Sequence, residues 1–158
     1  MRLEGTCLGD IEVEGEKIIT VPEGILGFQN SKRYVILDHN EDSPFKWLQS
    51  VDEPEVTFVI INPLFFKADY CIQIYRNEIS VLEPFDSNDI LIMVIVTIQK
   101  DSKDITANLQ GPLIINPKNQ LAKQVVLANN EYTTRHSIMP LYPPQENDLG
   151  RRSILQTM

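Results

Sequence analysis

The chain has 158 residues and carries 22 acidic against 14 basic side chains, for a formal net charge of −8. Its length suits one domain with a single core. The acidic balance disfavours direct nucleic-acid binding, because affinity for a polyanion comes mainly from cationic side chains. The longest apolar run is far shorter than the roughly 20 residues that span a bilayer, and the acidic amino terminus lacks the apolar segment of a signal peptide. We therefore expect a soluble cytoplasmic protein that does not bind a membrane.

The first 44 residues are predicted to form short strands separated by turns. Apolar and charged residues are interspersed between positions 2 and 21, which favours a hairpin or meander, and Glu14 and Gly15 predict its turn. The next segment, PEGILGF, contains two glycines and is predicted to be a loop. It is expected to return three apolar side chains to the sheet: Ile25, Leu26 and Phe28. A strand at 34–37 and an acidic loop at 38–44 are expected to follow.

The middle of the chain is expected to alternate strands with short turns. TFVII, residues 57–61, is predicted to be a buried strand. In the following strand, residues 71–75, apolar residues recur at every second position, so two isoleucines share one face: Ile72 and Ile74. Residues 78–82 predict a single helical turn, capped by Asn77 and ended by Pro84.

The longest apolar run, residues 90–98, is the centre of the predicted fold. Ile, Val and Thr supply seven of its nine residues, and these β-branched side chains favour a strand, which we expect to be buried on both faces. A polar strand at 105–109 is broken by Gly111 and Pro112, and an apolar strand resumes at 113–115. Together these segments predict an antiparallel meander.

The carboxy-terminal part is expected to contribute one more core strand and then a tail. Residues 117–123 predict a polar turn or short helix, residues 124–128 a core strand, and the chain up to Met139 an edge segment. Beyond it, 140–158 reads as a tail that is disordered or orders on a partner. The expected fold for residues 1–139 is mostly all-β: a small antiparallel β-barrel-like single domain with one or two short helical turns.

No arrangement of catalytic or metal-binding residues stands out. His39 stands among acidic residues, but a solvated loop is favoured over a cation site, because a flexible loop pre-forms no metal geometry. Asn108 is interpreted as a turn residue that bonds its own backbone. Cys7 and Cys71 belong to no CxxC pair and are interpreted as reduced, buried thiols. We expect no cofactor, no metal and no catalytic residue.

Six stretches form an ordered set along the chain: GILGF at 24–28, FKWLQS at 45–50, the strand at 58–63 with its terminal Asn-Pro, ADY at 68–70, ILIMVIVTI at 90–98 and TANLQGPLIIN at 106–116. The pattern continues at 124–127 and Tyr132. This ordered set resembles the FliW family of flagellar assembly factors. The resemblance covers most of residues 3–138, is most specific at TANLQGPLIIN, and leaves the tail outside.

The resemblance implies a non-enzymatic, β-barrel-like protein with two protein partners. One is CsrA, a homodimeric translational regulator that binds messenger RNA and represses flagellin synthesis; the other is flagellin. It also implies that binding to CsrA relieves this repression and that flagellin competes. An acidic surface fits such a role, since CsrA must carry cationic surface to hold RNA. We expect the protein to be monomeric by itself.

Three aromatic and four acidic residues are the candidate partner contacts. Exposed large aromatics dominate interface energetics, and carboxylates can steer a basic partner. Because neighbours in a strand point to opposite faces, at most one of the two adjacent phenylalanines is expected to be a contact. The candidates are Trp47, Phe65, Phe66, Asp69, Glu78, Glu83 and Asp86.

Two other classes of function stay open. An enzyme or small-ligand protein would use the barrel interior or mouth and would need a deep polar pocket, whereas the apolar inward pattern favours a filled interior. A direct RNA-binding domain would need a basic stripe with interleaved aromatics, which the charge disfavours. Closely spaced carboxylates could serve acid and base chemistry, although spacing alone indicates no site: Glu53 with Glu55, and Asp86 with Asp89.

Overall fold

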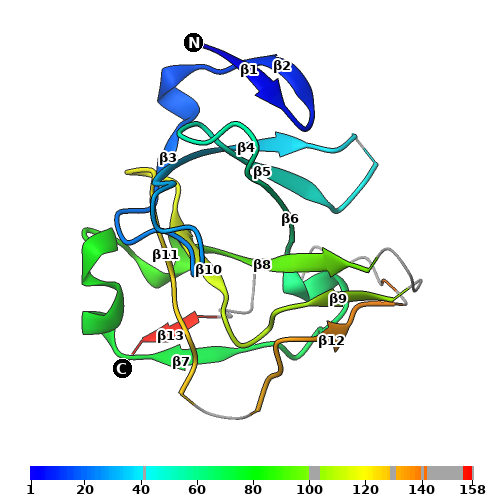
Figure 1. Cartoon of the computed structure of the whole chain (residues 1–158). Helices are drawn as coiled ribbons and strands as arrows, with labels where there is room; N and C mark the ends of the chain where they lie inside the picture. The colour runs from blue at the N-terminus through cyan, green and yellow to red at the C-terminus, as the bar shows by residue number, and fades with distance from the viewer. Residues whose placement is uncertain (41, 100–103, 129–130, 140, 142–154, 158) are drawn as a thin grey trace.

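The computed structural model describes residues 1–40, 42–99, 104–128, 131–139, 141 and 155–157. At its centre, seven strands close into a barrel (Figure 1), which confirms the predicted all-β, barrel-like fold. Around the ring the order is β10 (Leu113–Asn116), β11 (Leu121–Gln124), β3 (Ile19–Thr20), β4 (Arg33–Asp38), β5 (Lys46–Ser50), β6 (Thr57–Ile61) and β8 (Leu91–Ile98). Neighbouring strands pair antiparallel, except that β11 and β3 make a short parallel contact.

Apolar side chains fill the barrel. Residues that follow one another along a strand point to opposite faces; on β6, Phe58 and Ile60 join the inner cluster while Val59 and Ile61 pack outside. Inward residues from all seven strands form this one cluster, so the lumen is packed rather than open. Its buried members are Val21, Ile25, Tyr34, Leu48, Ile60, Met93, Leu113, Ile115 and Ala122.

β8 is the strand that the other elements share. One of its edges pairs with β6, and the other pairs with β10 and then with β9 (Ile105–Ala107), which extends the sheet to the edge strand β12 (His136–Ser137). The predicted strands around 105–109 and 113–115 are therefore present. The predicted meander is wrong, because both segments pair with β8 instead of with each other.

Asn108 and Gly111 build the interruption between β9 and β10. Asn108 Oδ1 accepts the N–H of Gln110 at 3.1 Å and the N–H of Gly111 at 2.9 Å, which confirms that this side chain bonds its own backbone. A Cβ added at Gly111 would lie 2.9 Å from Asn108 Nδ2. The close approach therefore favours glycine at this position.

The prediction that β8 is buried on both faces holds only for its centre. Ile92, Met93 and Val94 are buried from both sides of the strand, whereas Leu91 and Ile98 are exposed. Leu91 lies between the buried Ile90 and Ile92, so it is exposed by the direction of its side chain, whereas Thr97 and Ile98 at the other end of the strand are both exposed. Burial of a long apolar run thus depends on what covers it as well as on its own sequence.

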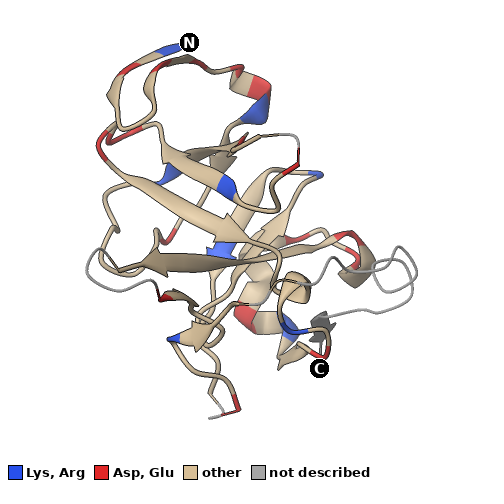
Figure 2. Ribbon diagram, turned by 90° about the vertical axis from the view of Figure 1, so that its right-hand side faces the viewer, with Lys and Arg blue, Asp and Glu red and all other residues tan. Residues whose placement is uncertain are grey.

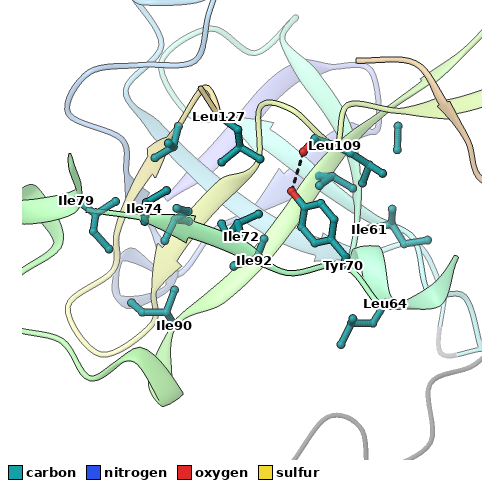
Figure 3. Close-up of a cluster of buried hydrophobic side chains, with 14 of the residues drawn as sticks. Ile61, Leu64, Tyr70, Ile72, Ile74, Ile79, Ile90, Ile92, Leu109 and Leu127 are labelled. Carbon is teal, nitrogen blue, oxygen red and sulfur yellow. Dashed lines mark hydrogen bonds between the residues drawn. The ribbon is translucent and has the colours of Figure 1, made fainter. Parts of the chain in front are cut away.

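A second apolar layer covers the outer face of β6, β8 and β10; residues 62–90, which supply most of it, are called the β7 layer here. Its elements are η2 (Pro63–Phe65), β7 (Ile72–Ile74), η3 (Arg76–Leu82) and η4 (Ser87–Asp89), all short, and β13 (Leu155–Thr157) runs parallel to β7. As predicted, Ile72 and Ile74 share the buried face of β7. Figure 3 shows this core, in which the Tyr70 hydroxyl donates to the Leu109 carbonyl at 2.7 Å.

The N-terminal hairpin, residues 1–18, covers the outer face of β4. It contains β1 (Arg2–Thr6), β2 (Gly9–Glu12) and the 3-10 turn η1 (Gly15–Lys17). The turn lies at 7–8 instead of the predicted 14–15, because Gly9 adopts a φ of +87° and Thr6 Oγ1 accepts the N–H of Leu8 at 3.1 Å. Its small core consists of Leu3, Val13, Val35 and Val51.

Of the three apolar side chains that the loop at 22–28 was predicted to return to the sheet, Ile25 returns fully, Phe28 in part, against Phe58 of β6, and Leu26 does not. Ile25 is buried in the lumen, but Leu26 and Phe28 are exposed. The backbone of this loop is held in place by a bond from Leu26 N–H to Gln124 Oε1 at 2.9 Å and by one from Phe28 N–H to the Ile25 carbonyl at 2.7 Å. These two bonds fix the path of the loop, in which Leu26 is the most exposed of the three apolar side chains.

The predicted core strand at 124–128 is displaced along the chain, since β11 occupies Leu121–Gln124. Beyond β11, Val125 and Leu127 are buried, and their N–H groups bond the carbonyls of Pro112 and Gln110 at 3.0 and 2.8 Å. The segment is therefore buried and backbone-bonded without being part of the regular ladder. Apolar alternation identified its burial but not its secondary structure.

The predicted helical turn at 78–82 exists, but it begins earlier, at Arg76, as η3. The residue before it is Tyr75, so the predicted cap at Asn77 is wrong. Tyr75 N–H donates to Glu78 Oε2 at 2.8 Å, which fixes the start of the segment. Within the part of the chain that the structure describes, no helix is long and apolar enough to cross a membrane.

The predicted tail, residues 140–158, is described only in part. Leu155–Thr157 of the predicted tail form β13, whereas 140 and 142–154, with the prolines on which the tail prediction rests, lie outside the described residues.

Cys7, in the hairpin turn, is exposed and Cys71 is half-buried. The prediction of a buried thiol is therefore wrong for Cys7, because its hairpin turn projects from the small core beneath it.

Candidate functional site

The seven predicted contact residues lie in three separate places instead of one surface (Figure 1). The first is the outer face of β5, the second is the segment around η2, and the third is the turn formed by η3 and η4. β7 separates the second place from the third. Trp47 lies in the first place, Phe65, Phe66 and Asp69 in the second, and Glu78, Glu83 and Asp86 in the third.

Trp47 is half-buried on the outer wall of the barrel. It pairs with Leu37 of β4 and Val59 of β6, and its ring lies 5.4 Å from that of His39. Trp47 thus presents part of its ring beside the acidic loop at 38–44. The residues that the structure describes contain no group of three or more His, Cys, Asp or Glu side chains that could hold a metal ion; Glu41 is not among them.

The two phenylalanines lie in and just after η2, not in a strand, so the argument that only one of them faces outward does not apply. Both belong to the β7 layer and are half-buried against its core cluster, and the Phe66 ring lies 5.7 Å from that of His136. Burial and the nearby Lys67 lower the pKa of His136. Asp69 is exposed, and its carboxylate pairs with Lys67 Nζ at 2.9 Å.

The three acidic residues of the third place each hold local structure. Glu78 accepts the N–H of Tyr75 at 2.8 Å, and Asp86 caps η4. Glu83 Oε1 accepts from Arg76 Nε at 2.8 Å. These carboxylates are exposed enough to meet a partner, but a partner would compete with the bonds that they already make.

Glu53 and Glu55, whose spacing alone indicated no site, line a surface pocket of about 410 Å³, here called the Glu53 pocket. It lies between residues 27–30 and the connection from β5 to β6, and Val56 completes its lining. A second, smaller pocket of about 230 Å³ lies between the end of β7 and residues 126–128. No signal in the sequence brings 27–30 beside 53–56, because the two segments meet only through the barrel.

A network of buried and partly buried hydrogen bonds supports the Glu53 pocket. Ser31 Oγ donates to Glu53 Oε1 at 2.5 Å and accepts from Ser50 Oγ at 3.0 Å. Ser50 Oγ also accepts the N–H of Glu53 at 2.9 Å, and the fully buried Gln49 donates to the Pro54 carbonyl at 2.9 Å. The backbone under the two glutamates is therefore fixed by side chains of β5.

The Tyr34 hydroxyl belongs to the same neighbourhood. Tyr34 is fully buried, and its hydroxyl lies within hydrogen-bonding reach of the Ser31 hydroxyl. The Ser31 hydroxyl also donates to Glu53 and accepts from Ser50. Burial raises the pKa of Tyr34 to about 12, and the charges of Glu53 and Asp52 act in the same direction. Tyr34 is therefore a neutral hydroxyl at physiological pH.

Comparison with known proteins decides the family. The family model described as FliW protein matches residues 2–138 of this chain. The chain belongs to the FliW family. This confirms the resemblance drawn from GILGF, TANLQGPLIIN and the other ordered stretches.

Individual FliW proteins are similar to this chain along nearly their whole length. The flagellar assembly factor FliW of Geobacter sulfurreducens is 43% identical over 136 residues, which cover 86% of this chain and 85% of that protein. The FliW of Natranaerobius thermophilus is 39% identical over 154 residues, 97% of each chain. The motifs alone left residues 140–158 outside the resemblance. This second alignment reaches into them, so the similarity to FliW extends beyond the motifs.

The fold is also that of FliW. A crystal structure of the flagellar assembly factor FliW superposes on this structure with a TM-score of 0.79 and 37% sequence identity, covering 89% of this chain and 98% of that one. This chain and a FliW protein of known structure therefore share the same fold. Similarity at this level places the chain in the family by sequence and by fold together.

Proposed function

We propose that this protein is a cytoplasmic flagellar assembly factor that acts by binding other proteins rather than by catalysis. Its partners are the translational regulator CsrA and flagellin, and on its own it is a monomer. The match to FliW proteins in both sequence and fold is the observation that carries the proposal. The printed names of the relatives, flagellar assembly factors, support the same role.

The protein works as a switch between its two partners. When flagellin is abundant in the cell, flagellin occupies the protein and CsrA is free to repress flagellin messenger RNA. When flagellin has been exported, the protein is released, binds CsrA and relieves the repression. Such a switch requires two competing binding equilibria and no chemical step.

The charge distribution supports attraction of a basic partner. The chain has a net charge of −8, and Figure 2 shows acidic residues recurring along the N-terminal hairpin and the loops. A field of this sign raises the association rate with a cationic protein, and salt screens it over about 8 Å at physiological ionic strength. The association rate with CsrA should therefore fall as salt rises.

Titration calorimetry of the purified protein against CsrA, repeated after saturation with flagellin, tests the proposal. The expected result is binding to CsrA that flagellin abolishes. Cytochrome c, a basic protein with no relation to flagella, is the control for attraction by charge alone. The absence of heat with both CsrA and flagellin, at low as well as physiological salt, would refute the proposal.

A further inference from the structure

The Glu53 pocket is acidic. Glu53 and Glu55 both line it, and the described residues of its lining include no Lys, Arg or His. Two cations close in sequence to the pocket are engaged with other groups: Arg33 pairs with Asp52 at 2.8 Å, and Lys32 Nζ donates to the Pro22 carbonyl at 2.8 Å. The two glutamates of the pocket therefore present negative charge that the lining itself does not neutralise.

An exposed aromatic ring forms part of the same lining. Phe28 is 40% exposed, and its ring packs edge-to-face with Phe58 at a centroid distance of 5.0 Å. An aromatic ring beside carboxylates is the combination that attracts an organic cation, because the ring quadrupole and the carboxylate charge act together. The flat guanidinium of arginine fits this chemistry best, since it can stack on a ring and bond a carboxylate at once.

The walls of the pocket are rigid. On one side, Gly24 adopts a φ of +72°, and a Cβ there would lie 2.6 Å from the Cα of Gln29. The backbone at Gly24 therefore packs too closely on Gln29 to accept any side chain. Ser31 N–H donates to the Phe28 carbonyl at 3.1 Å. On the other side, the amide of Gln49 holds the carbonyls of Pro54 and Val56. A preformed pocket loses little entropy when a side chain enters it.

We propose that the Glu53 pocket receives an arginine or lysine side chain of a basic protein partner. Glu53 and Glu55 supply the charge, and Phe28 supplies the ring against which the cation packs. The inference rests on the proposed function, in that CsrA is the basic partner used to test it. It assigns the partner's cationic anchor to a site that none of the seven residues singled out from the sequence occupies.

The test compares two double variants that remove the same amount of charge. Glu53→Gln with Glu55→Gln neutralises the pocket while keeping the acceptor oxygen that Ser31 bonds. Glu12→Gln with Asp42→Asn neutralises two exposed carboxylates outside the pocket. In calorimetric titrations with CsrA, we expect the pocket variant to bind at least about tenfold more weakly and the control to change less than about twofold.

Phe28→Leu and a spectroscopic readout keep the test independent of folding defects. Leucine keeps the bulk of Phe28 but not its ring, and we expect about a threefold loss of affinity. In ¹H–¹⁵N spectra of the full chain, addition of CsrA should shift the amide signals of Gly27, Gln29 and Val56. The thermal unfolding midpoint of each variant is measured alongside.

The outcomes separate this inference from the proposed function. If wild-type protein binds neither CsrA nor flagellin, the proposed function fails. If wild-type protein binds CsrA but the pocket variant binds equally well and the pocket amides do not move, the inference about the pocket is wrong and the function stands. Shifts of the same amides on addition of Mg²⁺ or Ca²⁺ alone, without an effect of CsrA, would mean an ion site and would also overturn the inference.

Discussion

The barrel has two outer coverings that differ sharply in how they are held. The β7 layer lies on a large cluster that includes Ile61, Ile92 and Ile114 of the barrel wall. The cluster beneath the N-terminal hairpin has only four buried residues, and two of these belong to the hairpin itself. A covering whose stability comes from many buried apolar side chains unfolds together with the core, and one that buries few can open locally. The two layers therefore differ in stability although both cover the same barrel.

Side chains that bond buried backbone groups strengthen the difference. In the β7 layer, the Asn116 amide donates to the carbonyls of Leu82 and Pro84 at 2.9 and 3.0 Å, and Asn116 itself is fully buried. In the hairpin, the amino terminus of Met1 donates to the Val13 carbonyl at 2.9 Å at the partly buried end of the chain. The first kind of bond ties a layer to the barrel, while the second ties the hairpin to itself.

The largest effect is expected from Leu82→Ala in the β7 layer. Leu82 is fully buried in the large cluster, so its truncation should lower the free energy of unfolding by about 3 to 4 kcal/mol. Urea denaturation measures the change, with Val126→Ala, at an exposed position, as the control. A loss below about 1 kcal/mol would mean that this layer contributes little to the stability of the barrel.

The same substitution in the hairpin, Leu3→Ala, should cost less, about 2 kcal/mol, because the small cluster can collapse around the lost side chain. Amide hydrogen exchange distinguishes local from global opening. We expect faster exchange in β1 and β2 while β8 keeps its protection. Equal acceleration in β8 would contradict the comparison, since it would show that the hairpin unfolds only with the barrel.

Removal of one buried hydroxyl, in Tyr70→Phe, should cost about 1 to 2 kcal/mol. The change leaves the Leu109 carbonyl without the hydrogen bond that it now accepts at 2.7 Å. Tyr75→Phe, at an exposed tyrosine, is the matched control and should leave the unfolding midpoint unchanged. An equal effect of the two substitutions would exclude this bond as the cause.

The smallest effect, at most about 1 kcal/mol, concerns pH. Burial opposes ionisation of Asp52, but the N–H groups of Lys32 and Arg33 and the Arg33 guanidinium prevail and hold the pKa of Asp52 below its usual value of 3.8. The ionised form therefore stabilises the folded state above the unfolded pKa, and this contribution is lost as pH falls through the folded pKa. Asp52→Asn should flatten the loss of stability below about pH 4. Unfolding at several pH values measures it, and identical acid profiles of variant and wild type would disprove the assignment.

Patterns within short segments predicted local structure well. The TFVII strand matches β6 residue for residue, and Ile72 and Ile74 share a buried face as their alternation indicated. Asn108 bonds its own turn, as an asparagine before a Gly-Pro break is expected to do. These features depend on neighbours in sequence, so a local pattern carries the necessary information.

Patterns predicted less well wherever distant segments compete for a residue. Phe28 was expected on the sheet and packs edge-to-face against Phe58 of β6, but its side chain stays 40% exposed. Leu26 was expected on the sheet as well but is 60% exposed. In both cases the exposure of the side chain depends on whether another segment covers it, which a local pattern does not specify.

By itself, the sequence determined that this protein is an all-β, acidic member of the FliW family, because alternation, turn residues and ordered motifs are properties of contiguous residues. Tertiary structure alone decided which residues meet. The Glu53 pocket joins 27–30 to 53–56, and the β7 layer joins residues 62–90 to the barrel wall. Closure of a barrel brings together segments whose separation along the chain leaves no periodic signal, so their contacts follow from the fold and not from any local pattern.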